Sequence, residues 1–339
     1  MKGAPQEGHD IVVIGCSAGG VEALPELLGK LPRNIPAAIF VVMHVSASTE
    51  SYLPRIISRH SKIPCAHALH GEPIQPGKIY VAPPDRHLLL EPDKVILGHG
   101  PKENRHRPAV DPLFRSAAQH FGSRVIGVIL TGSLDDGTAG LQAVKRCGGI
   151  AVVQHPDEAV APGMPMNAAQ YVSVDHVVPL EKIGPLLKKL IGQSAGDLPE
   201  PGCHEEASTI NQGVTMTQHE MQSRFGPPAG LICPECQGPI WEVAEGKHSQ
   251  FRCLVGHIFS PESFVAEEGA AVERALWVAV KTLQERADLL GKLADKSAAM
   301  GQSISASSFR EKARESQSHA ETIRDILKRV DAGDAPAEA

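Results

Sequence analysis

Hydrophobic residues over positions 9–193 form short apolar runs that alternate with stretches of helical spacing. The runs Ile11–Ile14, Ala38–Met43 and Val125–Leu130 are typical of buried strands, and Val21–Leu31 has the spacing of an amphipathic helix. Strands that alternate with helices predict an α/β fold, a doubly wound and mainly parallel sheet covered on both faces. The same patterns predict strands at Lys78–Ala82, Lys94–Leu97, Ile150–Val153, Tyr171–Val174 and Val177–Val178, and helices at Gly140–Arg146 and Glu181–Leu190.

The pattern changes after residue 193. Residues 194–229 lack apolar periodicity and carry Gly, Pro, Ser, Gln and charge, which predicts a flexible linker. Residues 230–260 hold a cluster of Cys and His, and residues 262–330 show coiled-coil spacing on both sides of Gly301, which predicts a helical hairpin. Because a polar linker transmits little force, we expect these C-terminal parts to act independently of residues 9–193.

Composition and charge exclude several classes of function. The chain has 339 residues and a net charge of −6, without the basic face that a nucleic-acid-binding protein needs. The N-terminus lacks the apolar segment of a signal peptide, and no apolar run is long enough to span a bilayer. We therefore expect a cytoplasmic protein with no membrane insertion and no nucleic-acid partner.

The first predicted strand leads into a tight, glycine-rich turn, Gly15-Cys16-Ser17-Ala18-Gly19. This G-x-S-x-G pattern is typical of a nucleophilic serine, and the helix that follows offers unpaired N–H groups to an oxyanion. A dinucleotide-binding loop would need Gly at position 17, and a phosphate-binding loop would need a Lys that the segment lacks. A strand-to-helix turn without catalytic role is the remaining alternative.

Three further candidates for serine catalysis follow predicted buried strands. His44 directly follows the strand Ala38–Met43, and Asp135 and Asp136 follow the strand Val125–Leu130. Because ligand sites of parallel sheets lie beyond the carboxyl ends of the strands, we expect these side chains to meet Ser17 at one edge of the sheet. The order Ser, His, Asp along the chain differs from that of α/β-hydrolases.

Residues 9–193 resemble the CheB-type protein-glutamate methylesterases of bacterial chemotaxis. The similarity is carried by the segments GCSAGG, MHVS, YVAPPDRHLLL, RPAVDPLFRSAA, TGSLDDGTAG and QHPDEAVAPGMPMNAA. The resemblance implies that Ser17, His44 and Asp136 form the catalytic triad, with Asp135 as the alternative acid. It also implies that no cofactor is needed for catalysis. Arg107, Asp111, Arg115 and Met164 lie in the matching segments, and we expect them to be structural.

The resemblance also implies an activity. The family hydrolyses glutamyl methyl esters on chemoreceptors through an acyl-enzyme, releases methanol, and can deamidate glutamines. Many members carry an N-terminal receiver domain, and we expect this chain to have none, since Ile11 already begins the first strand. Two alternatives stay open: a non-catalytic sensor or scaffold module of a signalling system, and an esterase for another small ester. The hairpin is a candidate surface for self-association.

The Cys/His cluster has the spacing of a structural zinc site. Cys233, Cys236, Cys253 and His257 follow the pattern C-x2-C-x16-C-x3-H, and His248 is the alternative fourth ligand. Three thiolates and an imidazole suit Zn²⁺, and four protein ligands leave no open position for catalysis. The sequence therefore predicts a zinc-ribbon-like module with structural zinc at 230–260.

Overall fold

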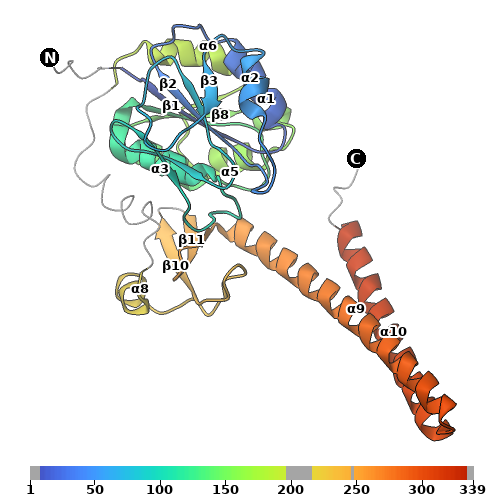
Figure 1. Ribbon diagram of the computed structural model, residues 1–339. Coiled ribbons are helices and arrows are strands. Elements are labelled where there is room, and N and C mark those ends of the chain that lie inside the picture. Colours follow the sequence, from blue (N-terminus) through green and yellow to red (C-terminus); the bar gives the residue numbers. More distant parts are fainter. Residues whose placement is uncertain (1–7, 196–215, 246–247, 334–339) are drawn as a thin grey trace. The chain divides into compact units, whose positions relative to one another are not determined.

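The computed structural model describes residues 8–195, 216–245 and 248–333 and divides the chain into two compact units. The first unit ends at Phe264, and the second begins at Val265 (Figure 1). The larger part of the first unit is an α/β layer structure. Its elements are β1 Ile11–Cys16, α1 Gly20–Gly29, β2 Ala38–Met43, α2 Leu53–Ser58, β3 Cys65–His67, β4 Ile79–Val81, β5 His87–Leu90, β6 Val95–Gly98, α3 Val110–Phe121, β7 Val125–Ile129, α4 Thr138–Arg146, β8 Ile150–Gln154, α5 Gly163–Tyr171, β9 His176–Val178 and α6 Leu180–Ile191.

The central sheet of the described residues has seven parallel strands in the order β3-β4-β2-β1-β7-β8-β9. The three strands β2, β1 and β7 are therefore neighbours at its centre, and their carboxyl ends meet at one edge. The prediction of an α/β fold with a mainly parallel sheet is confirmed.

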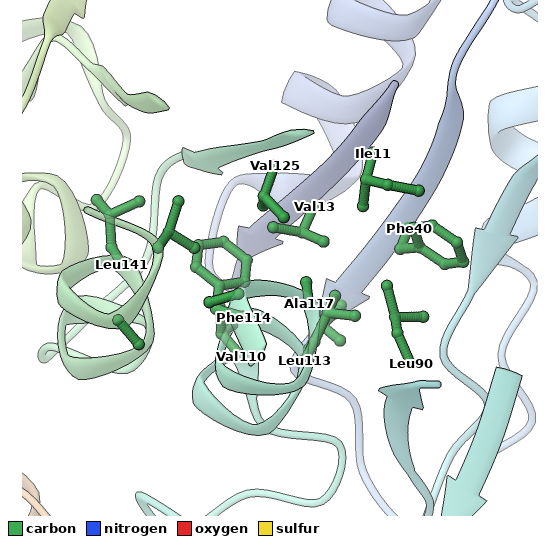
Figure 2. Packing of buried hydrophobic residues seen from close by; sticks show 14 of the residues in the cluster. Ile11, Val13, Phe40, Leu90, Val110, Leu113, Phe114, Ala117, Val125 and Leu141 are labelled. Atoms are coloured by element: carbon green, nitrogen blue, oxygen red, sulfur yellow. The ribbon is translucent and has the colours of Figure 1, made fainter. Parts of the chain in front are cut away.

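Alternate residues of β1 face two separate cores, as the period of a strand requires. Val13 packs against α3, α4 and α5, whereas Val12 and Ile14 pack against α1, α2 and α6. Figure 2 shows the first core, in which Leu113 and Phe114 of α3 lie against the strands. Helices therefore cover both faces of the sheet, and both faces of its central strands are apolar.

Two predicted elements differ from the structure, and helix α3 was missed. The segment Tyr171–Val174 is not a strand, because Tyr171 ends α5 and the strand β9 begins at His176. The predicted strand at Lys94–Leu97 exists as β6, but it pairs antiparallel with β5 outside the main sheet. Helix α3 was not predicted, although Val110, Leu113 and Ala117 repeat at helical spacing.

The range for which the sequence predicts a linker contains a helix, α8, at Gln218–Phe225. It begins with a capping box in which Thr217 and Glu220 satisfy each other's backbone N–H groups. Residues 196–215 of that range lie outside the described part of the chain. The prediction of flexibility was based on the absence of apolar periodicity, and a short, exposed helix that buries only Met221 has almost none.

The segment 230–260 forms a small antiparallel sheet in the order β10-β11-β12. Its core consists of Cys233, Ile240, Cys253 and Phe259, together with Phe264. The strands are β10 Ile240–Glu245, β11 His248–Cys253 and β12 Ile258–Phe259. We call residues 230–260 the ribbon.

The second unit is a helical hairpin, as predicted. Helix α9 spans Pro261–Ala299 and begins at the end of the first unit, and α10 spans Ser303–Gly333. Gly301, with a φ of 74°, allows the turn between them. Within the described residues, no helix combines the length and apolar character that crossing a bilayer requires.

Candidate active site

Ser17 stands in the turn between β1 and α1, at the carboxyl edge of the sheet. Gly19 has a φ of 79°, a conformation that side chains rarely adopt, and it lets the chain turn directly into the helix. The Ser17 N–H donates to the Thr131 carbonyl, with 2.9 Å between N and O, so the nucleophile turn is joined to the loop after β7. Ser17 is half-buried and Ala18 is exposed, which leaves the hydroxyl open to a substrate.

His44 follows β2 and joins the two other predicted residues. Its Nδ1 lies 3.1 Å from Ser17 Oγ, and its Nε2 lies 2.6 Å from Asp136 Oδ2. With the ring proton on Nε2, the imidazole donates to Asp136, and the Nδ1 lone pair can accept the Ser17 proton. The structure thus brings Ser17, His44 and Asp136 into one hydrogen-bonded chain across three neighbouring strands.

Asp136 is buried and accepts four hydrogen bonds. Besides His44, the donors are the Asn104 amide at 2.9 Å and the backbone N–H groups of Val110 at 2.7 Å and Asp111 at 3.3 Å. The last two belong to the first turn of α3, where the helix dipole favours a negative charge. Burial alone would raise the pKa of Asp136, but the bonds from His44, Val110 and Asn104 outweigh it and hold that pKa below its ordinary value.

Asp135, the alternative acid, has different partners. Its Oδ1 accepts from Ser260 Oγ at 2.7 Å and from Ser263 Oγ at 3.2 Å, and its side chain has no bond to His44. Burial raises the pKa of Asp135 to about 7 against the opposing effect of the Ser260 hydroxyl. The geometry therefore favours Asp136 as the partner of the imidazole.

Sequence reasoning missed two residues of this site. The His106 ring stacks on His44, with ring centroids 3.6 Å apart and an angle of 11° between the planes. Burial and the neighbouring His44 lower the pKa of His106 to about 3, so its ring is neutral at physiological pH. Asn104 bridges Asp136 and Asp111. Both residues precede α3 rather than follow a strand, so the rule that pointed to Ser17 and His44 gave no signal for them.

The four residues that we expected to be structural make contacts in and around the site. Arg107 donates to Asp85 and to the Gly100 carbonyl, and Arg115 pairs with buried Glu103 at 2.5 Å. Asp111 accepts from the Gly140 N–H at 2.6 Å, and its burial beside Asp136 raises its pKa. A Cβ on Gly132 would lie 2.0 Å from the sulfur of Met164 and 3.0 Å from the Cβ of Ser17, so Met164 would have to move to admit a larger residue.

The predicted metal ligands also meet. The Sγ atoms of Cys236 and Cys253 lie 3.5 Å apart, and His257 Nδ1 lies 3.5 Å from Cys253 Sγ and 3.7 Å from Cys233 Sγ. All four ligand atoms lie within 4.8 Å of one another. A tetrahedral zinc with Zn–S of about 2.3 Å would separate its ligand atoms by roughly 3.5–3.8 Å. The four side chains fit such an ion. The side chain of His248, the alternative ligand, lies outside the described part of the chain.

The ribbon contacts residues 9–193, a packing that the polar linker did not predict. Glu103 forms a parallel β-bridge with Ile258, and Lys102 Nζ lies 2.7 Å from Glu235 Oε1. Ser260 bonds both to Asp135 and to Asn104. The linker pattern could not reveal these contacts, because they arise from residues 102–104 and 235–260, which are far apart in the sequence.

A parallel α/β sheet that carries a hydrogen-bonded Ser–His–Asp chain at its carboxyl edge has the arrangement of side chains that serine hydrolases use. A model of the CheB methylesterase family matches residues 12–187, which is more than half of the chain. This chain belongs to the CheB methylesterase family.

Similar proteins support this assignment. The chain is 40% identical over 183 residues to a Leptospira interrogans protein named as a protein-glutamate methylesterase/protein-glutamine glutaminase, and covers 95% of it. It is 41% identical over 177 residues to the protein-glutamate methylesterase/protein-glutamine glutaminase of group 3 operon of Bradyrhizobium diazoefficiens. That match covers 51% of this chain and 48% of the relative. The crystal structure of the Thermotoga maritima CheB methylesterase catalytic domain is 36% identical. It superposes with a TM-score of 0.53, covering 54% of this chain and all of that one.

Proposed function

We propose that this chain hydrolyses glutamyl methyl esters on methyl-accepting chemoreceptors or related signalling proteins. The observation that carries the proposal is the hydrogen-bonded chain from Ser17 through His44 to Asp136 in a member of the CheB methylesterase family. The relatives' names support the ester as substrate, and they also support a glutaminase activity, in which ammonia takes the place of methanol.

The geometry supports a two-step mechanism. His44 Nδ1 takes the proton of Ser17 as the oxygen attacks the ester carbonyl, and Asp136 stabilises the imidazolium that forms. The protonated ring then gives its proton to the departing methanol. Water hydrolyses the acyl-enzyme in the second step, with His44 again as the base. Among the described residues, the N–H groups of Ala18 and Gly19 have no hydrogen-bond acceptor, and we assign them to the oxyanion.

A fluorophosphonate probe tests the nucleophile against the alternative of a non-catalytic scaffold. The probe phosphonylates only a serine that its base has activated, so the wild-type chain should carry one label at Ser17. Ser17→Ala should carry none, and His44→Ala should react at least about 10²-fold more slowly. An unlabelled wild-type chain with intact fold would favour the scaffold.

Cys233, Cys236, Cys253 and His257 are the proposed ligands of a structural zinc. The support is their chemistry and their spacing, since three thiols and one ring nitrogen converge at tetrahedral distances. A closed set of four protein ligands leaves no position for substrate, so the ion would stabilise the ribbon and take no part in the ester chemistry.

Metal analysis of the purified chain tests this site. We expect about one zinc per chain, and its loss in Cys233→Ser and in Cys253→Ser. Cys65→Ser is the matched control, because Cys65 lies in β3 and should leave the zinc content unchanged. A chain purified without chelator that contains no zinc would contradict the proposal.

The hairpin is the proposed surface for self-association. Its helix α9 exposes large apolar side chains, among them Val272, Trp277 and Val278, which are 59%, 47% and 65% exposed. Exposed apolar side chains on a helix with coiled-coil spacing favour contact with a second copy of the helix.

A further inference from the structure

The junction between the ribbon and α9, residues 258–264, lies against the loop that carries Asn104. The Asn104 N–H donates to the Ile258 carbonyl at 2.8 Å, next to the bridge between Glu103 and Ile258. An ion pair between Lys102 and Glu235 lies at the more exposed rim of the same contact. The end of the ribbon is thus packed beside the residues that support the triad.

Asn104 joins this junction to the triad. Its Nδ2 donates to Asp136 Oδ1 at 2.9 Å and to Asp111 Oδ2 at 2.8 Å, and its Oδ1 accepts from the Ser260 N–H at 3.0 Å. Asn104 is buried, and its backbone lies in the left-handed region with a φ of 47°. The Ser260 N–H fixes which end of the amide faces Asp136.

Ser260 makes a second connection through its hydroxyl. Its Oγ donates to Asp135 Oδ1 at 2.7 Å and accepts from the Ser263 N–H at 3.0 Å, at the start of α9. Asp135 directly precedes Asp136, so this bond also fixes the backbone that carries the triad acid. Ser260 therefore contacts both neighbours of Asp136: its backbone N–H bonds to Asn104, and its hydroxyl bonds to Asp135.

The groups that form this contact are buried, so each needs its hydrogen-bond partner within the protein. Ser260 is 8% exposed, and Asp135 and Asn104 are each 3% exposed. If the junction separated from the loop, the Asn104 carbonyl and the Asp135 carboxylate would each lose the partner that satisfies them. A buried acceptor without a partner costs free energy that rearrangement of the acid loop would relieve.

We propose that Ser260 is a positioning residue of the esterase, which acts through Asn104 and Asp135 to hold Asp136 against His44. The inference rests on the proposed function, because it concerns the same triad. It makes the ribbon a part of the active-site support rather than an appended module. His257 directly precedes β12, so the proposed zinc would anchor the strand that leads to Ser260.

The test compares full-length Ser260→Ala and Ser260→Thr with the wild-type chain on a peptide that contains one glutamate γ-methyl ester. We expect kcat to fall about tenfold or more in Ser260→Ala, because small misplacements of a catalytic group are costly. KM should stay within about twofold, since Ser260 does not touch substrate. Ser260→Thr keeps the hydroxyl and should recover most of kcat. Fluorophosphonate labelling at saturation counts the folded sites, so that kcat refers to folded protein only.

Glu235→Gln is the matched control, because it removes the rim ion pair of the same contact and leaves Ser260 in place. A kcat for Ser260→Ala within about twofold of wild type would overturn the inference. A loss that Ser260→Thr does not recover, or an equal loss in Glu235→Gln, would also overturn it, since either shows an effect of packing alone. A wild-type chain that neither labels nor turns over would instead refute the proposed function.

Discussion

At the scale of single residues, two adjacent carboxyl groups have opposite surroundings. Asp136 accepts four hydrogen bonds, which favour its charged form, whereas Asp135 is buried with two serine hydroxyls. The partners of Asp136 come from residues 44 and 104–111, whereas those of Asp135 come from residues 260–263. Asp135 and Asp136 therefore have separate roles, although they are adjacent in the sequence.

The matched pair Asp136→Asn and Asp135→Asn tests this division. Asp136→Asn replaces the charge that stabilises the imidazolium, and we expect kcat to fall by about 10³ or more. Asp135→Asn keeps an oxygen that can accept from Ser260, and we expect kcat within about threefold of wild type. Steady-state kinetics on the methyl-ester peptide measure both. Equal losses in the two variants would contradict the assignment of Asp136.

The raised pKa of Asp135 predicts a pH dependence of stability. A carboxyl whose folded pKa is about 7 binds more protons when folded than when unfolded between about pH 4 and 7. Its contribution is therefore complete below pH 4 and is lost as the pH rises through 7. Relative to Asp135→Asn, the wild type should lose free energy of unfolding over this window, on the order of a few kcal/mol at most. Denaturant unfolding at pH 4.5 and 7.5 measures the difference, and a constant difference would contradict the prediction.

At the scale of elements, the sequence predicted the strands and site residues that leave a local pattern in the chain. Apolar runs located β1, β2 and β7, and the rule that sites follow parallel strands located Ser17, His44 and the acid loop. Between Asp135 and Asp136, only the family resemblance chose. Helix α3 was missed although its apolar residues repeat at helical spacing, and His106 and Asn104 were missed with the loop before it. The Asn104–Ser260 bond joins residues 156 positions apart, which no local pattern can reveal.

The ribbon provides a prediction at this scale. If zinc holds β12 in place, removal of the metal should disturb the acid loop through Ser260. We expect Cys233→Ser to lower kcat on the methyl-ester peptide about tenfold, although the zinc takes no part in the chemistry. Cys65→Ser should keep the wild-type kcat. A zinc-free variant with full activity would show that the junction holds without the metal.

At the scale of the whole molecule, the chain consists of two compact units with different compositions. The first unit joins the α/β layers and the ribbon, and the second is a hairpin of two long helices with exposed apolar side chains. The regions matched by the Leptospira and Thermotoga proteins account for about half of the chain. The ribbon and the hairpin are therefore the parts in which this chain could differ from an isolated esterase domain.

The hairpin supplies the prediction for the second unit. We expect the full chain to self-associate in a concentration-dependent way, and Trp277→Ser combined with Val278→Ser to weaken the association at least about tenfold. Sedimentation velocity over a range of concentrations measures it. Because these residues lie in the second unit, kcat on the methyl-ester peptide should not change. A wild-type chain that remains monomeric at about 100 times the concentration used in the kinetic assays would contradict the proposal.

The central claim is that Ser17 of this chain cleaves a glutamyl methyl ester. The most direct measurement is methanol release from a methylated chemoreceptor fragment, with the wild-type chain and Ser17→Ala compared at equal concentration. Wild type should release methanol with multiple turnovers, and Ser17→Ala should be slower by at least about 10³ because the triad acts as a unit. Methanol release by Ser17→Ala at a rate near that of wild type would contradict the account.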